Sequence, residues 1–119
     1  MEKSSGTLTL VGTPIGNAAD LTPRALKALE NADVIACEDT RRSLPFLLGR
    51  GVKKPLVSYH KHNEKSGAEY LVRLLEEGKN VALITDAGMP GISDPGAVVV
   101  RLARQAGITV TCAPGPTAL

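Results

Sequence analysis

Residues suited to binding a ligand gather in the segment Thr85–Gly96, where glycine, proline and aspartate dominate. Glycines let the backbone turn sharply and approach a ligand closely. Asp86 stands at the end of the apolar run Val81–Ile84, where a strand would end, and a carboxylate there can accept hydrogen bonds from a ligand amine or hydroxyl. We therefore favour a ligand role for Asp86 over that of a turn residue. Asp94 precedes Pro95, a pattern typical of a helix N-cap.

Two further loops share this character, Val11–Asn17 and Pro114–Ala118. The first lacks the G-x-G-x-x-G spacing of a Rossmann loop and the lysine and hydroxyl residue of a P-loop. On the residues alone, an ordinary strand-to-helix turn explains it equally well. The second loop would present backbone N–H and C=O groups that suit an adenine edge or a carboxylate, and a domain linker is the alternative.

Positive charge is concentrated between Glu38 and Lys65, where seven lysine and arginine residues stand against three acidic ones. The whole chain carries a net charge of only +2, so this segment holds most of the positive excess. Such clustering suits contacts with nucleic-acid phosphates. A solvated surface face is an equally weighted alternative, because the segment offers few aromatic side chains for stacking. The candidate contacts with nucleic-acid phosphates are Arg41, Arg42, Lys61 and Lys65.

Residues capable of assisting group transfer follow the expected strands Asp33–Cys37 and Lys54–Tyr59. A base of near-neutral pKa, or a cation that polarises the attacking oxygen, would activate a hydroxyl. The catalytic candidates are Glu38, Arg41 and His60. The residues leave open which of these is the base, or whether the base comes from outside this chain. His60 and His62 also have a metal-binding spacing, but no third ligand is near them, so we expect no metal.

Strand and helix signals alternate along the chain. The expected strands are Thr7–Gly12, Asp33–Cys37, Lys54–Tyr59, Asn80–Thr85 and Ile108–Cys112. The expected helices are Pro23–Asn31 with Thr22 as N-cap, a helix starting near Thr40, a helix capped by Asn63 and ended by Gly78, and Pro95–Gln105. This order specifies an α/β fold, a five-stranded parallel sheet with helices on both faces and ligands at the carboxyl ends of the strands. Residues 1–6 are expected to be a disordered tail and residues 7–119 the domain.

The composition and the apolar segments of the chain indicate its cellular compartment. Hydrophobic residues make up 43% of the chain, enough for a core. Cys37 and Cys112 each lie in an apolar run, and we expect both to be buried free thiols in a reducing compartment. The start of the chain lacks the apolar core of a signal peptide, and no apolar stretch approaches the ~20 residues of a membrane span. We expect a cytoplasmic protein that binds no membrane.

The three Gly/Pro-rich loops together resemble the signature loops of the tetrapyrrole methylase superfamily. The resemblance is closest to its ribosomal RNA branch, the small-subunit rRNA 2′-O-ribose (cytidine) methyltransferases. The segments Cys37–Arg41 and Tyr59–Glu64 support this narrower match. Met89 and Thr117 depart from the pattern, which has a small polar residue and a serine at these positions. The resemblance spans Thr7 to the end of the chain.

The resemblance implies a sheet in the order 3-2-4-1-5 and S-adenosylmethionine as cofactor, bound in a cleft between two domains. The implied cofactor contacts are Pro14, Ile15, Asp86, Met89, Pro90, Gly91, Thr117 and Ala118. Because the chain stops inside a loop at Leu119, we expect it to be the N-terminal half of the enzyme and to hold half of the cofactor site. The implied partner is small-subunit ribosomal RNA or the assembled small subunit, and we expect the full-length enzyme to be a homodimer.

Two other functions compete with this one. The first is a tetrapyrrole methyltransferase, or one acting on a diphthamide-type modified histidine, within the same superfamily. The basic segment and the motifs after the second and third strands favour the RNA branch over it. The second is a non-enzymatic, flavodoxin-like binding module, which predicts an acidic cluster or a flavin-stacking aromatic residue at the strand ends. Tryptophan is absent and Phe46 is the only phenylalanine, which disfavours this alternative.

Overall fold

The computed structural model describes residues 5–13, 22–38, 40–60, 63–86 and 96–113. The strands are β1 (Thr7–Thr13), β2 (Val34–Cys37), β3 (Leu56–Ser58), β4 (Val81–Asp86) and β5 (Thr109–Ala113). The helices are α1 (Pro23–Asn31), α2 (Thr40–Leu48), α3 (Glu64–Glu76) and α4 (Gly96–Gln105). The alternation expected from the sequence is therefore confirmed, with small shifts at the element boundaries.

All neighbouring strands pair in parallel, and their order across the sheet is β3-β2-β4-β1-β5. This confirms both the α/β fold class and the strand order that the resemblance implied. β4 is the middle strand, which explains why its sequence reads as a continuous apolar run rather than an alternating one. Since parallel strands all end at the same edge, the segments that follow them share one side of the molecule.

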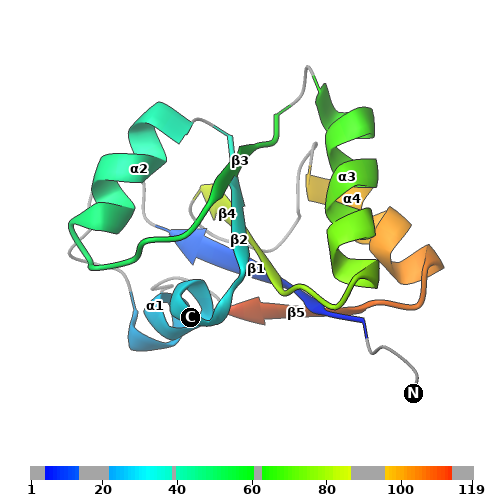
Figure 1. Ribbon diagram of the computed structural model, residues 1–119, viewed down its shortest axis with the longest axis horizontal. Coiled ribbons are helices and arrows are strands. Elements are labelled where there is room, and N and C mark those ends of the chain that lie inside the picture. The colour runs from blue at the N-terminus through cyan, green and yellow to red at the C-terminus, as the bar shows by residue number, and fades with distance from the viewer. Residues whose placement is uncertain (1–4, 14–21, 39, 61–62, 87–95, 114–119) are drawn as a thin grey trace.

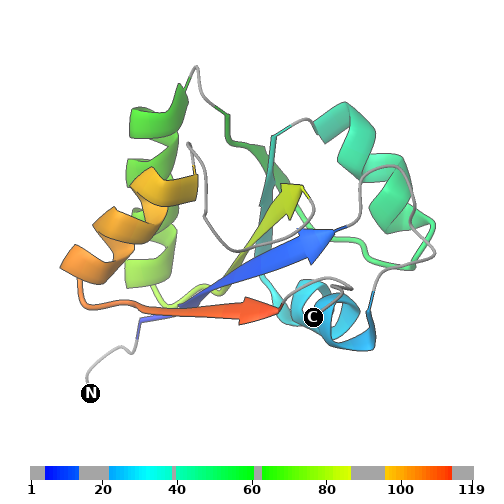
Figure 2. The ribbon, with the colours of Figure 1, turned by 180° about the vertical axis from the view of Figure 1, so that it is seen from behind.

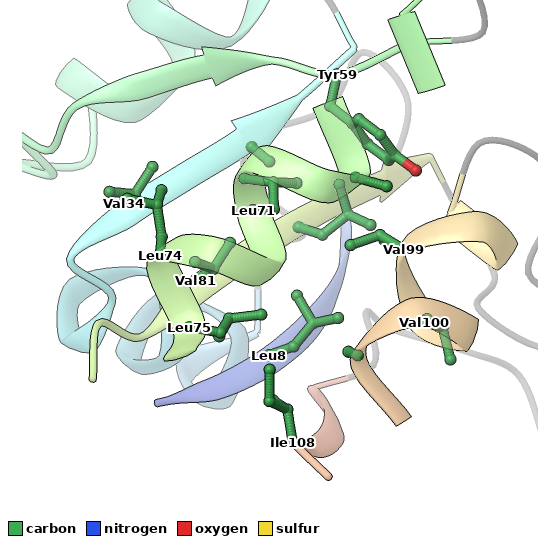
Figure 3. Packing of buried hydrophobic residues seen from close by; sticks show 14 of the residues in the cluster. Leu8, Val34, Tyr59, Leu71, Leu74, Leu75, Val81, Val99, Val100 and Ile108 are labelled. Carbon is green, nitrogen blue, oxygen red and sulfur yellow. The ribbon is translucent and has the colours of Figure 1, made fainter. Parts of the chain in front are cut away.

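The helices form two layers, with α1 and α2 on one face of the sheet and α3 and α4 on the other (Figures 1 and 2). The larger core cluster lies between the sheet and the α3–α4 layer, and includes Leu8, Leu71, Leu75 and Val99 (Figure 3). A second cluster lies beneath α1 and α2 and includes Leu29. The chain thus leaves β1 and β2 toward one face, and β3 and β4 toward the other.

Several helix ends follow the signals in the sequence. The Thr22 hydroxyl accepts a hydrogen bond from the backbone N–H of Ala25 at 3.1 Å, and Pro23 opens α1, as expected. Gly78 follows α3 with a φ of 96°, in the left-handed region that favours glycine. Within the described part of the chain, no helix has both the length and the apolar character needed to cross a membrane.

The expected helix start near Thr40 is confirmed, and Pro45 therefore lies inside α2, where it cannot donate the backbone hydrogen bond that would reach back to Arg41. Two expectations are corrected. Cys112 is exposed, whereas Cys37 is buried, because β5 is an edge strand of the sheet that the described residues form. Asn63 occupies the N-cap position of α3, but its side chain makes no capping hydrogen bond.

Candidate active site

The ends of three neighbouring strands define one half of the site. Thr13, the last residue of β1, is in register with Asp86, the last residue of β4. On the other side of β1, Val11 is in register with Ala113, the last residue of β5. The three Gly/Pro-rich loops therefore leave the sheet from adjacent strands, although they are far apart in the sequence.

Beyond the Thr13–Asp86 pair, the two strands lead to opposite faces of the sheet. β1 continues toward α1 on one face of the sheet, and β4 continues toward α4 on the opposite face (Figures 1 and 2). In open parallel sheets, ligands bind at the carboxyl ends of strands where the connections separate in this way. The implied cofactor contacts other than Asp86 lie outside the described residues; these are Pro14, Ile15, Met89, Pro90, Gly91, Thr117 and Ala118.

The other half of the site follows β2 and β3. Cys37 is in register with Ser58, and the backbone N–H of Tyr59 donates to the Cys37 carbonyl at 2.8 Å. Glu38 follows β2 and is exposed, while His60 follows β3 and is half-buried. The structure therefore places these two catalytic candidates at the carboxyl edge, after the paired strands β2 and β3, of which β2 also pairs with β4.

Arg41 belongs to the same edge. It is exposed in the first turn of α2, which begins directly after β2. Lys65 is exposed in the first turn of α3, after β3. Figure 1 shows α2 and α3 both beginning near the ends of these strands. Of the other candidate RNA contacts, Arg42 lies in α2 and Lys61 lies outside the described residues.

The basic segment of the sequence does not form one surface. Arg50 and Lys53 are exposed between the end of α2 and the start of β3. The backbone N–H of Ile35, near the start of β2, donates to the carbonyl of Pro55 at 3.0 Å, so this stretch lies at the amino edge of the sheet. The positive charge thus divides between the two edges, and only part of it faces the loops.

In the connection from β3 to α3, Asn63 does not act as the expected helix cap. The side chain of Asn63 bonds to backbone atoms of Ser58 and His60 instead of capping α3. Glu64, the next residue, has a buried Oε2 atom with no hydrogen-bond partner among the described residues. Among the described residues, no group of three His, Cys, Asp or Glu side chains is placed to hold a metal ion.

This chain belongs to the family of tetrapyrrole (corrin/porphyrin) methylases, whose sequence profile matches residues 7–119. The methyl donor in this family is S-adenosylmethionine. A solved structure described as uroporphyrin-III-C-methyltransferase from Thermus thermophilus is similar, with a TM-score of 0.73 and 29% identity over 94% of this chain and 48% of that one. A diphthine synthase structure has a TM-score of 0.74 at 17% identity and shares the fold.

The relatives that are closer in sequence have a more particular name, ribosomal RNA small subunit methyltransferase I. The protein from Mycoplasmopsis pulmonis is 52% identical over 109 residues, which cover 92% of this chain and 49% of the relative. The protein from Thermotoga maritima is 50% identical over 114 residues, covering 96% and 51%. The protein from Escherichia coli O157:H7 is 50% identical over 117 residues, covering 98% and 41%. The chain thus spans about half the length of these relatives.

Proposed function

We propose that this chain is the S-adenosylmethionine-binding half of an enzyme that methylates a ribose 2′-OH of small-subunit ribosomal RNA. The observation that carries the proposal is the register of β1 with β4 and β5. It brings together the ends of the three strands that the signature loops follow. The identity of about half of all positions to relatives named ribosomal RNA small subunit methyltransferase I supports the RNA substrate.

The cofactor site fits this geometry. The ends of β4, β1 and β5 are adjacent, so a ligand lying across them meets all three loops at once. Asp86 would accept hydrogen bonds from a ligand amine or hydroxyl, and the remaining contacts would come from Pro14, Ile15, Met89, Pro90, Gly91, Thr117 and Ala118. When bound, S-adenosylmethionine supplies an activated methyl group. A second domain, of the kind that would account for the greater length of the relatives, would close the opposite wall.

The RNA would lie along the ends of β2 and β3. Arg41, Arg42, Lys61 and Lys65 would contact phosphates, which gives affinity without reading sequence. Glu38 or His60 would accept the proton of the 2′-OH, and Arg41 would stabilise the developing charge on that oxygen. The positions of Glu38, Arg41 and His60 after the ends of β2 and β3 support these roles. We further propose that the enzyme is cytoplasmic and works as a homodimer.

A direct test uses the two-domain protein, meaning this chain continued by the second half that the relatives have. It is incubated with methyl-labelled S-adenosylmethionine and either small-subunit RNA or assembled small subunits. The RNA is then digested to nucleosides, which are separated by mass. Label on the ribose is the expected result. Label on a base, or labelling of a tetrapyrrole or of a protein histidine in place of RNA, would exclude the proposed reaction.

A further inference from the structure

The side chain of Asn63 forms two hydrogen bonds with the backbone between β3 and α3. Asn63 Oδ1 accepts a hydrogen bond from the backbone N–H of His60 at 2.8 Å. Asn63 Nδ2 donates to the backbone carbonyl of Ser58 at 2.9 Å. The backbone N–H of Asn63 also donates to the carbonyl of His60 at 3.1 Å. Asn63 therefore holds the last residue of β3 and the backbone on both sides of the His60 side chain.

This arrangement uses a side chain that would otherwise stabilise the helix. Asparagine is among the preferred N-cap residues, because its side-chain oxygen can accept a hydrogen bond from a backbone N–H in the first turn of the helix. Asn63 stands at that position of α3, yet its side chain makes no cap hydrogen bond. Its amide atoms are directed to the β3–α3 connection, so the geometry of that connection is maintained in place of the ordinary cap.

The residue before His60 is fixed as well. The ring of Tyr59 packs directly on the backbone of α3, because a Cβ atom added to Gly67 would lie 2.7 Å from Tyr59 Cδ1. Tyr59 is only 1% exposed and lies at one end of the core cluster beneath α3 (Figure 3). The half-buried His60 thus lies between an anchored aromatic ring and the Asn63 hydrogen bonds.

We propose that Asn63 is the positioning residue that holds His60 at the carboxyl edge for methyl transfer to RNA. This inference rests on the proposed function and extends it to a residue that does not contact the reacting atoms. A histidine that polarises or deprotonates a hydroxyl must be held within a fraction of an ångström of its productive position. The Asn63 hydrogen bonds supply that constraint through the backbone of His60.

The test compares three variants of the two-domain protein. Asn63→Ala removes both side-chain bonds, and Asn63→Asp keeps an oxygen that can accept from the His60 N–H. Asn80→Ala is the matched control, because Asn80 also forms a side-chain-to-backbone hydrogen bond, at the amino edge of the sheet. Its Oδ1 atom accepts from the Thr7 N–H at 2.9 Å. For each, kcat and KM for RNA, the affinity for S-adenosylmethionine, the melting temperature and amide hydrogen exchange at His60 are measured.

We expect Asn63→Ala to lower kcat at least about tenfold with bound RNA and to increase exchange at the His60 amide, with unchanged cofactor affinity. Asn63→Asp should recover part of the rate. Asn80→Ala should lower the melting temperature without changing kcat. Equal rates for Asn63→Ala and Asn80→Ala, after correction for the folded fraction, would refute the positioning role. An unmodified protein that does not methylate RNA would instead refute the proposed function itself.

Discussion

Thr13 and Asp86 are register partners at the last positions of β1 and β4, two parallel strands that are far apart in the sequence. From this pair the chain turns to opposite faces of the sheet, toward α1 and α4 (Figure 2). A ligand placed at their ends meets loops from both directions, and the end of β5 adds a third. The proposed cofactor half of the site depends on this pairing.

Replacement of Asp86 tests that half of the site. Asp86→Ala in the two-domain protein should weaken binding of S-adenosylmethionine by roughly ten- to hundredfold, because an unpaired buried ligand group costs about 1–3 kcal/mol. Isothermal titration measures the change. The matched control is Asp33→Ala, since Asp33 Oδ2 accepts from the Asn80 backbone N–H at 2.8 Å at the amino edge. If both variants lose stability equally and neither loses cofactor affinity, Asp86 is a structural residue.

Charge-reversal variants test the basic residues at the two edges of the sheet separately. Arg41→Glu with Lys61→Glu should impair RNA methylation and leave cofactor affinity nearly unchanged. Each lost phosphate contact should lower the salt-dependence slope of RNA binding by about one or slightly less. Arg50→Glu with Lys53→Glu makes the same change in net charge at the amino edge and should have a much smaller effect. Methylation and RNA binding are measured across salt concentrations, and equal losses for both pairs would contradict an RNA surface at the carboxyl edge.

The sequence predicts the elements of this fold because the signals are local. Thr22, Pro23 and Gly78 act through their own backbone positions, and they end or begin helices where expected. The order of the sheet came from the resemblance, since strand pairing is a long-range property. Charge along the chain does not predict the division of the basic segment, because the fold decides at which edge of the sheet each residue lies. Arg50 and Lys53 follow the helix that carries the chain back to the amino edge.

Other differences arise from contacts that no local pattern records. Asn63 has the residue type and position of a helix cap, and only the proximity of the Ser58 carbonyl and the His60 N–H redirects its side chain. Cys112 lies in an apolar run, but its strand is at the edge of the sheet, and so the side chain is exposed. Both outcomes depend on neighbours that the fold brings together.

Removal of the α1 cap tests the local signals. Thr22→Ala deletes the acceptor for the Ala25 N–H and should lower the free energy of unfolding by about 1 kcal/mol. Thr22→Ser keeps a hydroxyl in the same place and should retain most of that stability. Chemical denaturation of this chain measures both. A Thr22→Ser variant as unstable as Thr22→Ala would show that the methyl group, and not the hydroxyl, carries the effect.

Enlargement of Gly67 tests the packing of Tyr59. Gly67→Ala would place a Cβ atom 2.7 Å from Tyr59 Cδ1 and should cost about 1–3 kcal/mol of unfolding free energy by overpacking. Tyr59→Leu removes the ring, so the double variant should lose less stability than the sum of the two single variants. Denaturation of all three proteins completes the cycle, and strict additivity would mean that the two residues do not press on each other.

The most direct measurement of the central claim is the location of bound S-adenosylmethionine on this half of the protein. The backbone amides of the isotopically labelled two-domain protein are followed by NMR during titration with the cofactor. We predict that the largest shifts in this half fall at the ends of β1, β4 and β5 and in the segments that follow them, with small shifts around Gly6, Asp33 and Asn80 at the amino edge. Shifts concentrated at the amino edge, or absent from the ends of β1 and β4, would contradict it.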